Sequence, residues 1–219
     1  MLTLIKRELR EFGVIFIVAP LILFFAFVIT ISASTIIHNE VEYNKFPPLG
    51  LPENMVTVFQ FVVFLLPVIS TLFGAGQMYS DRNKKISTFL VTLATDRRRI
   101  LIAKLIIGVI SILASICLFV ITDAVLLRIV PRLIPLDTGF ITRMISLALV
   151  LNLAGYSVGL SMGWGEGRLL RFVGSLLITI LLMTIVIYKG LSLETLSILA
   201  ILALAFFIRT WQRFMSTSL

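Results

Sequence analysis

The sequence has very few of the side chains that build catalytic and metal sites. In 219 residues there is one histidine, His38, and one cysteine, Cys117. A zinc site needs three or four such ligands, and a catalytic triad needs a base beside its nucleophile, so neither can be assembled here. A lone cysteine cannot close a disulfide within the chain, and Cys117 is expected to pack as a small apolar residue. We therefore expect no catalytic residue, metal or cofactor in this chain.

Charged residues are also scarce, at 14% of the chain against 59% apolar residues. A chain of this length cannot hide so much apolar surface in one soluble core, so the composition predicts a protein of the lipid bilayer. The net charge of +8 would suggest nucleic acid in a soluble protein. In a bilayer protein it serves orientation and lipid contact, so we expect no nucleic-acid partner.

Two further absences limit how the chain could use energy. It has no Gly-x-x-x-x-Gly-Lys-Ser/Thr loop, and the glycine-rich stretch GWGEGR at 163–168 lacks that ending, so the chain does not itself hydrolyse ATP by that chemistry. A proton-coupled carrier ordinarily needs ionisable groups at the middle of its membrane helices, and none is found there. Energy for transport would have to come from another chain, and we expect no enzyme activity here.

Long apolar runs are the dominant feature that is present. A membrane-spanning helix needs roughly 20 apolar residues, and the sequence offers six such runs. They are 13–37, 55–79, 100–130, 140–163, 169–188 and 191–208. The third is long enough to overrun the hydrocarbon, and the sixth is short and starts close to Glu194. We predict an all-α integral membrane protein with six spans in a single domain, 1–219, and counts of five or seven spans stay open.

The basic residues divide unevenly between the two sides of these runs. If both termini are cytoplasmic, fourteen of the nineteen lysines and arginines lie inside and five outside. The inner set is Lys6, Arg7, Arg10, Arg82, Lys84, Lys85, Arg97, Arg98, Arg99, Lys104, Arg168, Arg171, Arg209 and Arg213. The positive-inside rule then predicts an N-in and C-in topology. Residues 1–11 carry Leu2, Ile5 and Leu9 on one side of a charged helix, which predicts an interfacial helix on the inner leaflet.

The inner connection between the second and third runs, residues 81–98, is the most informative stretch. Its apolar residues recur at helical spacing, Ile86, Phe89, Leu90, Leu93 and Ala94, with hydroxyl-bearing side chains opposite, so it predicts a two-faced helix. Asp96 is expected to cap the helix that follows. Lys104, two turns into that helix, is expected to extend its amine back to the lipid phosphates.

This stretch resembles the corresponding segment of ABC-2 type transporter permeases. The similarity is carried by Asp81 and Arg82, by Leu90, and by the run Arg97, Ile100 and Lys104, which matches Arg-x-x-Ile-x-x-x-Lys. The six-span plan and the flat N-terminal helix are similar too. Lys85, Thr88 and Ala94 stand where the family often has Gly, Glu and Pro.

The resemblance implies a function. In that family the segment is a coupling helix that docks on a cytoplasmic ATP-binding subunit. The docking residues it implies are Ile86, Ser87, Thr88, Phe89, Leu90, Thr92 and Arg97. It also implies a homo- or heterodimer of permease subunits, ATP and magnesium bound by the partner, and an exporter in the plasma membrane, the inner membrane of a prokaryotic cell.

The fourth run contains glycines at a regular interval. Gly155, Gly159 and Gly163 are spaced by four residues, and Asn152 lies one turn earlier. Small residues on one face let two helix backbones approach closely, and Asn152 can bond across the contact. The pattern predicts helix packing, either within the subunit or in a dimer.

Two other interpretations stay open on the sequence alone. The length and six-span plan are similar to a haem-exporter permease of the cytochrome c maturation type. The third possibility, from a different class, is a polytopic carrier or scaffold without an ATP-binding partner.

Overall fold

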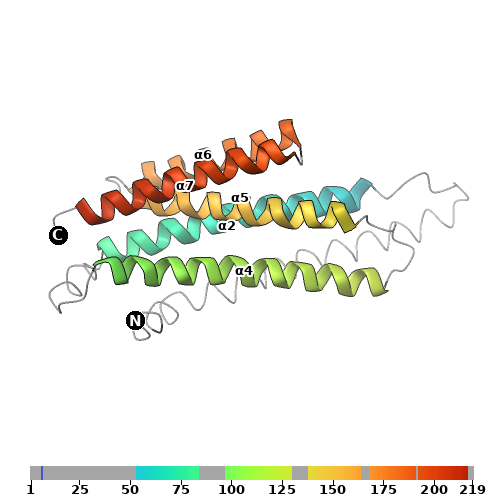
Figure 1. Cartoon of the computed structure of the whole chain (residues 1–219), viewed down its shortest axis with the longest axis horizontal. Helices are drawn as coiled ribbons and strands as arrows, with labels where there is room; N and C mark the ends of the chain where they lie inside the picture. The colour runs from blue at the N-terminus through green and yellow to red at the C-terminus, as the bar shows by residue number, and fades with distance from the viewer. Residues whose placement is uncertain are drawn as a thin grey trace, which may run out of the picture.

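The computed structural model describes Lys6 and residues 53–83, 97–129, 138–163, 168–190 and 192–216. Within these ranges the chain forms five long helices and no strand, as the composition predicts. They are α2 (Glu53–Asn83), α4 (Arg97–Ile129), α5 (Thr138–Gly163), α6 (Arg168–Lys189) and α7 (Leu193–Ser216). The five helices lie side by side along one long axis (Figure 1).

Four of the described helices are long and apolar enough to cross a membrane. Their apolar segments are Arg98–Cys117, Ile145–Gly163, Phe172–Lys189 and Leu193–Ser216. Large apolar side chains on the outside of these helices, such as Leu177 and Ile201, are exposed in the chain, as lipid-facing residues would be. Together these findings indicate a membrane-embedded protein. The expected first span, 13–37, lies outside the described residues.

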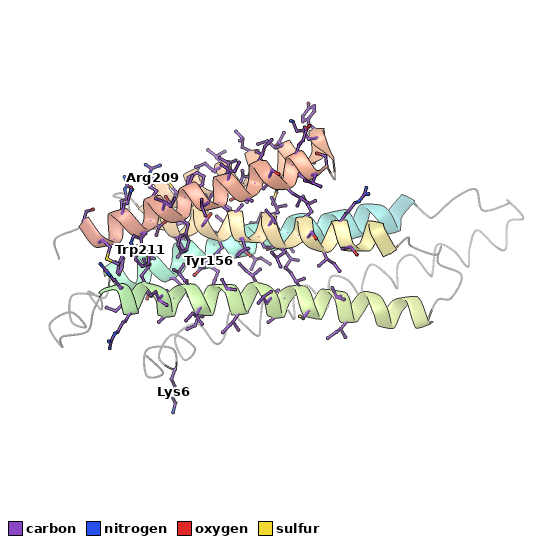
Figure 2. All side chains as sticks on the ribbon, viewed as in Figure 1. Lys6, Tyr156, Arg209 and Trp211 are labelled. Atoms are coloured by element: carbon purple, nitrogen blue, oxygen red, sulfur yellow. The ribbon has the colours of Figure 1, made fainter. Side chains whose placement is uncertain are left out.

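The helix directions alternate along the chain. In Figure 1, α2, α5 and α7 run one way and α4 and α6 run the other, so the end of α2 and the start of α4 lie at the same end of the bundle. That end also carries the exposed side chains of Arg98, Arg99, Arg209 and Arg213. Trp211 and Arg209 lie close to it in Figure 2.

Helix α5 is the centre of the described bundle, because it contacts each of the other four helices. One apolar cluster joins α5 to α4 and to the end of α7, through residues such as Leu160, Ile107 and Phe214. A second cluster joins α5 to α6 and α7, through Leu151, Leu182 and Leu199. Of the four spans above, α5 is the one most covered by its neighbours.

The sixth predicted run is longer as a helix than the sequence suggested. The prediction ended at Ile208, but α7 continues to Ser216. Thr210 and Phe214 are buried beyond Arg209, and Trp211 packs against the cluster that includes α4. Packing against the cluster that α4 and α5 form therefore extends the helix past its first arginine. Cys117, in contrast, lies on an exposed side of α4 and is not packed inside the chain.

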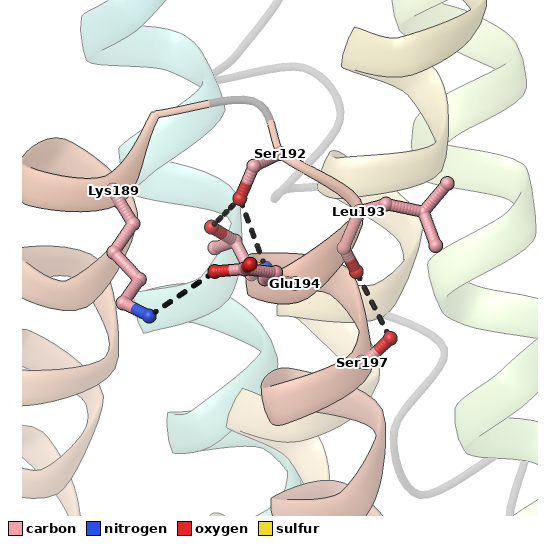
Figure 3. Close-up of polar contacts among 6 residues, drawn as sticks. Lys189, Ser192, Leu193, Glu194 and Ser197 are labelled. Carbon is pink, nitrogen blue, oxygen red and sulfur yellow. Dashed lines mark hydrogen bonds and ion pairs between the residues drawn. The ribbon is translucent and has the colours of Figure 1, made fainter.

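A tight hairpin joins α6 to α7 at the opposite end (Figure 3). Gly190 adopts φ 68° and donates its N–H to the Val186 carbonyl at 2.8 Å, a helix end that favours glycine. The Ser192 hydroxyl accepts the Thr195 N–H at 3.2 Å and so caps α7. Lys189 and Glu194 form an exposed ion pair at 3.5 Å.

Candidate functional site

Six of the seven predicted docking residues lie outside the residues that the structure describes, and the side chain of the seventh is not described. Ile86, Ser87, Thr88, Phe89, Leu90 and Thr92 all fall in residues 84–96, which lie outside the described ranges. Arg97 is the first residue of α4, and its side chain is not described. The structure instead gives the two helices that hold this segment, α2 ending at Asn83 and α4 beginning at Arg97. The candidate site is therefore built from these helices and from α5, which they contact.

The predicted packing glycines lie against α2 of the same chain. A Cβ atom on Gly155 would be 2.7 Å from the Pro67 carbonyl oxygen, and one on Gly163 would be 2.7 Å from that of Ala75. A Cβ on Gly159 would overlap the Thr71 carbonyl oxygen. Each glycine therefore meets backbone that cannot swing away, and the two helices run in parallel with matched four-residue repeats. Only glycine lets α5 approach α2 this closely.

Polar side chains tie α2 to both α5 and α6 near its proline. The Ser70 hydroxyl donates to Asn152 Oδ1 at 2.8 Å, and Asn152 Nδ2 donates to the Ala148 carbonyl at 2.6 Å. The Thr71 and Thr179 hydroxyl oxygens lie 2.8 Å apart and link α2 to α6. All of these side chains are buried. Such bonds in membrane proteins contribute about 0.6 kcal/mol each on average, so they fix orientation more than they add stability.

Tyr156 of α5 reaches between α2 and α4, closer to the end that holds residues 84–96 (Figure 2). Its hydroxyl lies 2.7 Å from Gln77 Oε1 on α2 and 3.1 Å from the Lys104 carbonyl oxygen on α4. Its ring stacks on Phe73, with ring centroids 6.0 Å apart. One side chain thus makes polar contacts with both helices that flank the predicted coupling segment.

Two glycines, one on each neighbouring helix, make room for Tyr156. A Cβ on Gly74 would be 2.6 Å from the Tyr156 carbonyl oxygen, and a Cβ on Gly108 would overlap the Tyr156 phenol ring. Gly108 also follows Lys104 by one helical turn, so at this position there is no side chain to keep the hydroxyl from the Lys104 carbonyl. We call these five residues, Gly74, Gln77, Lys104, Gly108 and Tyr156, the Tyr156 junction.

The expected position of Lys104 was wrong. Its side chain is wholly buried within the chain, where the sequence predicted an amine extended to lipid phosphates. The physical reason is that Lys104 shares a helix face with Ile100 and Ile107, which belong to the core cluster. That face of α4 points at α5 and α7, so it carries the lysine inward. A buried ionisable residue at membrane depth is a functional candidate in its own right.

The junction contains one donor with nothing to bond. Gln77 is fully buried, and its Nε2 has no hydrogen-bond partner among the described residues. The Ser161 hydroxyl on α5 is also buried without a hydrogen-bond partner among the described residues. The Tyr156 hydroxyl has one proton and two acceptors within reach, so it cannot fully satisfy both Gln77 and Lys104. The described arrangement is therefore incompletely paired at its centre.

Sequence reasoning did not identify Gln77, Gly108 or Thr179 as contact residues. Gln77 lies within an apolar run, where one amide does not stand out. Gly108 is the single glycine in α4, and an isolated glycine inside an apolar helix is a usable sign of close approach. Among the described residues no group of three or more His, Cys, Asp or Glu side chains could hold a metal ion.

Comparison of the chain with protein-family models, with curated proteins and with solved structures found no match. The functional assignment therefore rests on the residues themselves.

Proposed function

We propose that this chain is the transmembrane permease subunit of an ATP-binding cassette exporter of the ABC-2 type. It would have six spans with both termini in the cytoplasm, sit in a prokaryotic plasma membrane, and pair with a second permease subunit. ATP hydrolysis would occur on a separate cytoplasmic subunit, which docks on the helix predicted within 84–96. Movement of that helix would then tilt α2 and α4 and open a path for substrate.

One observation carries the proposal. The segment that resembles a coupling helix connects α2 to α4 in the chain, and the adjoining ends of these helices lie at the end of the bundle that carries Arg98, Arg99, Arg209 and Arg213. Of the other described cations, Arg143 lies near the start of α5 and Lys189 lies at the end of α6. Both of these helix ends are at the opposite end of the bundle. By the positive-inside rule this distribution supports a cytoplasmic position for the segment, where an ATP-binding subunit could reach it.

The proposal is tested by ATP hydrolysis in lipid nanodiscs. The chain is co-expressed with a candidate Walker-type ATP-binding subunit, to be sought among adjacent reading frames, and wild type is compared with Phe89→Ala/Leu90→Ala. We expect the double variant to insert normally but to lose association and permease-dependent ATPase activity. The matched control is Leu177→Ala/Ile180→Ala, which removes similar apolar area from an exposed face of α6 and should leave both properties unchanged.

Two results would count against the proposal. If the folded Phe89→Ala/Leu90→Ala variant keeps full association and ATPase activity, the docking role of the segment is wrong. If wild type neither binds nor stimulates such a subunit, the non-ABC carrier or scaffold becomes the better account.

A further inference from the structure

The Tyr156 junction lies close to the segment that the proposed function assigns to ATPase docking. Gln77 is six residues before Asn83, the last residue of α2, and Lys104 is seven residues after Arg97, the first residue of α4. At about 1.5 Å per residue, each lies on the order of 10 Å from the segment. A push on residues 84–96 would therefore reach these two positions within three helical turns.

Tyr156 is the point where both helices meet α5. Its hydroxyl contacts Gln77 of α2 and the Lys104 carbonyl of α4, and its ring rests on Gly74 and Gly108. Helix α5 in turn is packed backbone to backbone on α2 and contacts α6 and α7. A change in the position of α4 relative to α2 must therefore either carry Tyr156 along or break its contacts.

The bonding at the junction leaves one buried donor, Gln77 Nε2, without a partner among the described residues. A buried donor without a partner costs free energy, and Gln77 Nε2 is such a donor in the described arrangement. If α4 moves away from Tyr156, water can reach the amide and satisfy it, while the hydroxyl loses the Lys104 carbonyl. Hydration of the Gln77 amide would lower the free energy of the opened arrangement, and loss of the hydrogen bond from Tyr156 to the Lys104 carbonyl would raise it. Opposing contributions of this kind can give a packed element two states of similar free energy.

We infer that the Tyr156 hydroxyl is a releasable link that transmits movement of the 84–96 segment, through α2 and α4, to α5 and the rest of the bundle. This inference rests on the proposed function for its driving force. Tyr156 and Gln77 are positioning residues in this account, because they hold helices and touch no substrate. In the described arrangement the link is closed, because the Tyr156 hydroxyl lies within hydrogen-bond distance of the Lys104 carbonyl on α4.

The inference predicts opposite effects for two substitutions. Tyr156→Phe keeps the ring on its glycines but removes the hydroxyl, so it weakens the closed arrangement. Gln77→Leu removes the unpaired amide and leaves the hydroxyl bonded to the Lys104 carbonyl, so it strengthens the closed arrangement. In the Tyr156→Phe/Gln77→Leu double variant both partners are apolar, and the effects should largely cancel. A purely structural role would make both single variants shift in the same direction.

The experiment measures the distance between spin labels at Arg99→Cys and Val173→Cys in a Cys117→Ser background, with the full chain in nanodiscs. Both positions are exposed and lie near the segment end of α4 and α6. We expect each single variant to change the ratio of closed to open populations about threefold, in opposite directions, which is the effect of one interhelical hydrogen bond in a membrane. Thr184→Val, which removes an exposed hydroxyl of α6 that bonds the Ile180 carbonyl of the same helix, is the control and should leave this ratio unchanged.

The same labels then report on the complex with the ATP-binding subunit and a non-hydrolysable ATP analogue. We expect the nucleotide to change the wild-type distance and Tyr156→Phe to reduce that change while association stays intact. Shifts in the same direction for both single variants, no shift for either, or a full nucleotide response in Tyr156→Phe would overturn the inference. Those outcomes leave the proposed function standing. If the wild-type chain does not associate with the ATP-binding subunit, the result counts against the proposed function itself.

Discussion

Gly159 of α5 lies so close to Thr71 of α2 that a single added carbon would overlap the Thr71 carbonyl oxygen. The contact is the middle one of three, with Gly155 on Pro67 and Gly163 on Ala75. Pro67 has no N–H and therefore frees a carbonyl one turn earlier in α2, which membrane helices tolerate when neighbouring groups satisfy it. The glycines of α5 and the proline-containing centre of α2 are thus parts of one packing surface.

The first prediction concerns this surface. Gly159→Ala should destabilise the fold by about 1–3 kcal/mol, because the methyl group meets backbone that cannot move aside. The control is Gly76→Ala, where an added Cβ has no atom of the described residues within 4 Å. It should be neutral or stabilise the helix by about 0.5–1 kcal/mol. Thermal unfolding of both variants in detergent checks the difference, and equal melting temperatures would contradict the packing described.

The second prediction concerns the glycine under the Tyr156 ring. Gly108→Ala should destabilise the fold, again by about 1–3 kcal/mol, because its Cβ would overlap the phenol ring. The cost should largely disappear in a Tyr156→Ala background, where the ring is absent. The measurement is a double-mutant cycle of unfolding free energies, and additive effects of the two substitutions would show that the residues do not meet.

The third prediction concerns the polar pair between α2 and α5. Ser70→Ala and Asn152→Ala should show a coupling energy of about 0.6 kcal/mol, with an upper bound near 1.7 kcal/mol. The pair is buried and its atoms are 2.8 Å apart. The coupling is obtained from reversible unfolding of the two single variants and the double variant. A coupling near zero would mean that the hydroxyl and the amide have other partners.

The fourth prediction separates two contacts in the α6–α7 hairpin. Ser192→Ala removes the cap of α7 and should cost about 1 kcal/mol. Glu194→Gln removes an exposed ion pair at 3.5 Å and should cost well under 1 kcal/mol, because water screens it. Unfolding of the two variants under the same conditions tests the order, and a larger effect of Glu194→Gln would reverse the assignment.

Much of the helical plan could be predicted from the sequence, because apolar runs of membrane-spanning length have few other solutions. The described helices contain the second, fourth and fifth predicted runs, and their glycine spacing was visible in advance. The end of α7 could not be placed, since Arg209 ends the apolar run while burial of Thr210 and Phe214 continues the helix.

The centre of the candidate site was less accessible to sequence reasoning. A lysine one or two turns inside a span normally reaches for the interface, and only the packing of α4 on α5 and α7 shows that Lys104 is buried. Gln77, Gly108 and Tyr156 are distant in the chain, and no local pattern connects them. These residues meet because of how three helices pack, and the apolar periodicity of a single helix does not predict that packing.

The central claim is that the segment between α2 and α4 docks on a cytoplasmic ATP-binding subunit. The most direct test places a photo-activated cross-linking residue at Thr88 in cells that also express the candidate Walker-type ATPase, with the same residue at Tyr188 as control. Tyr188 is 86% exposed at the other end of the bundle. The account predicts a cross-link to the ATPase from Thr88 and none from Tyr188. A correctly inserted protein that cross-links from Tyr188 alone, or from neither position, would contradict it.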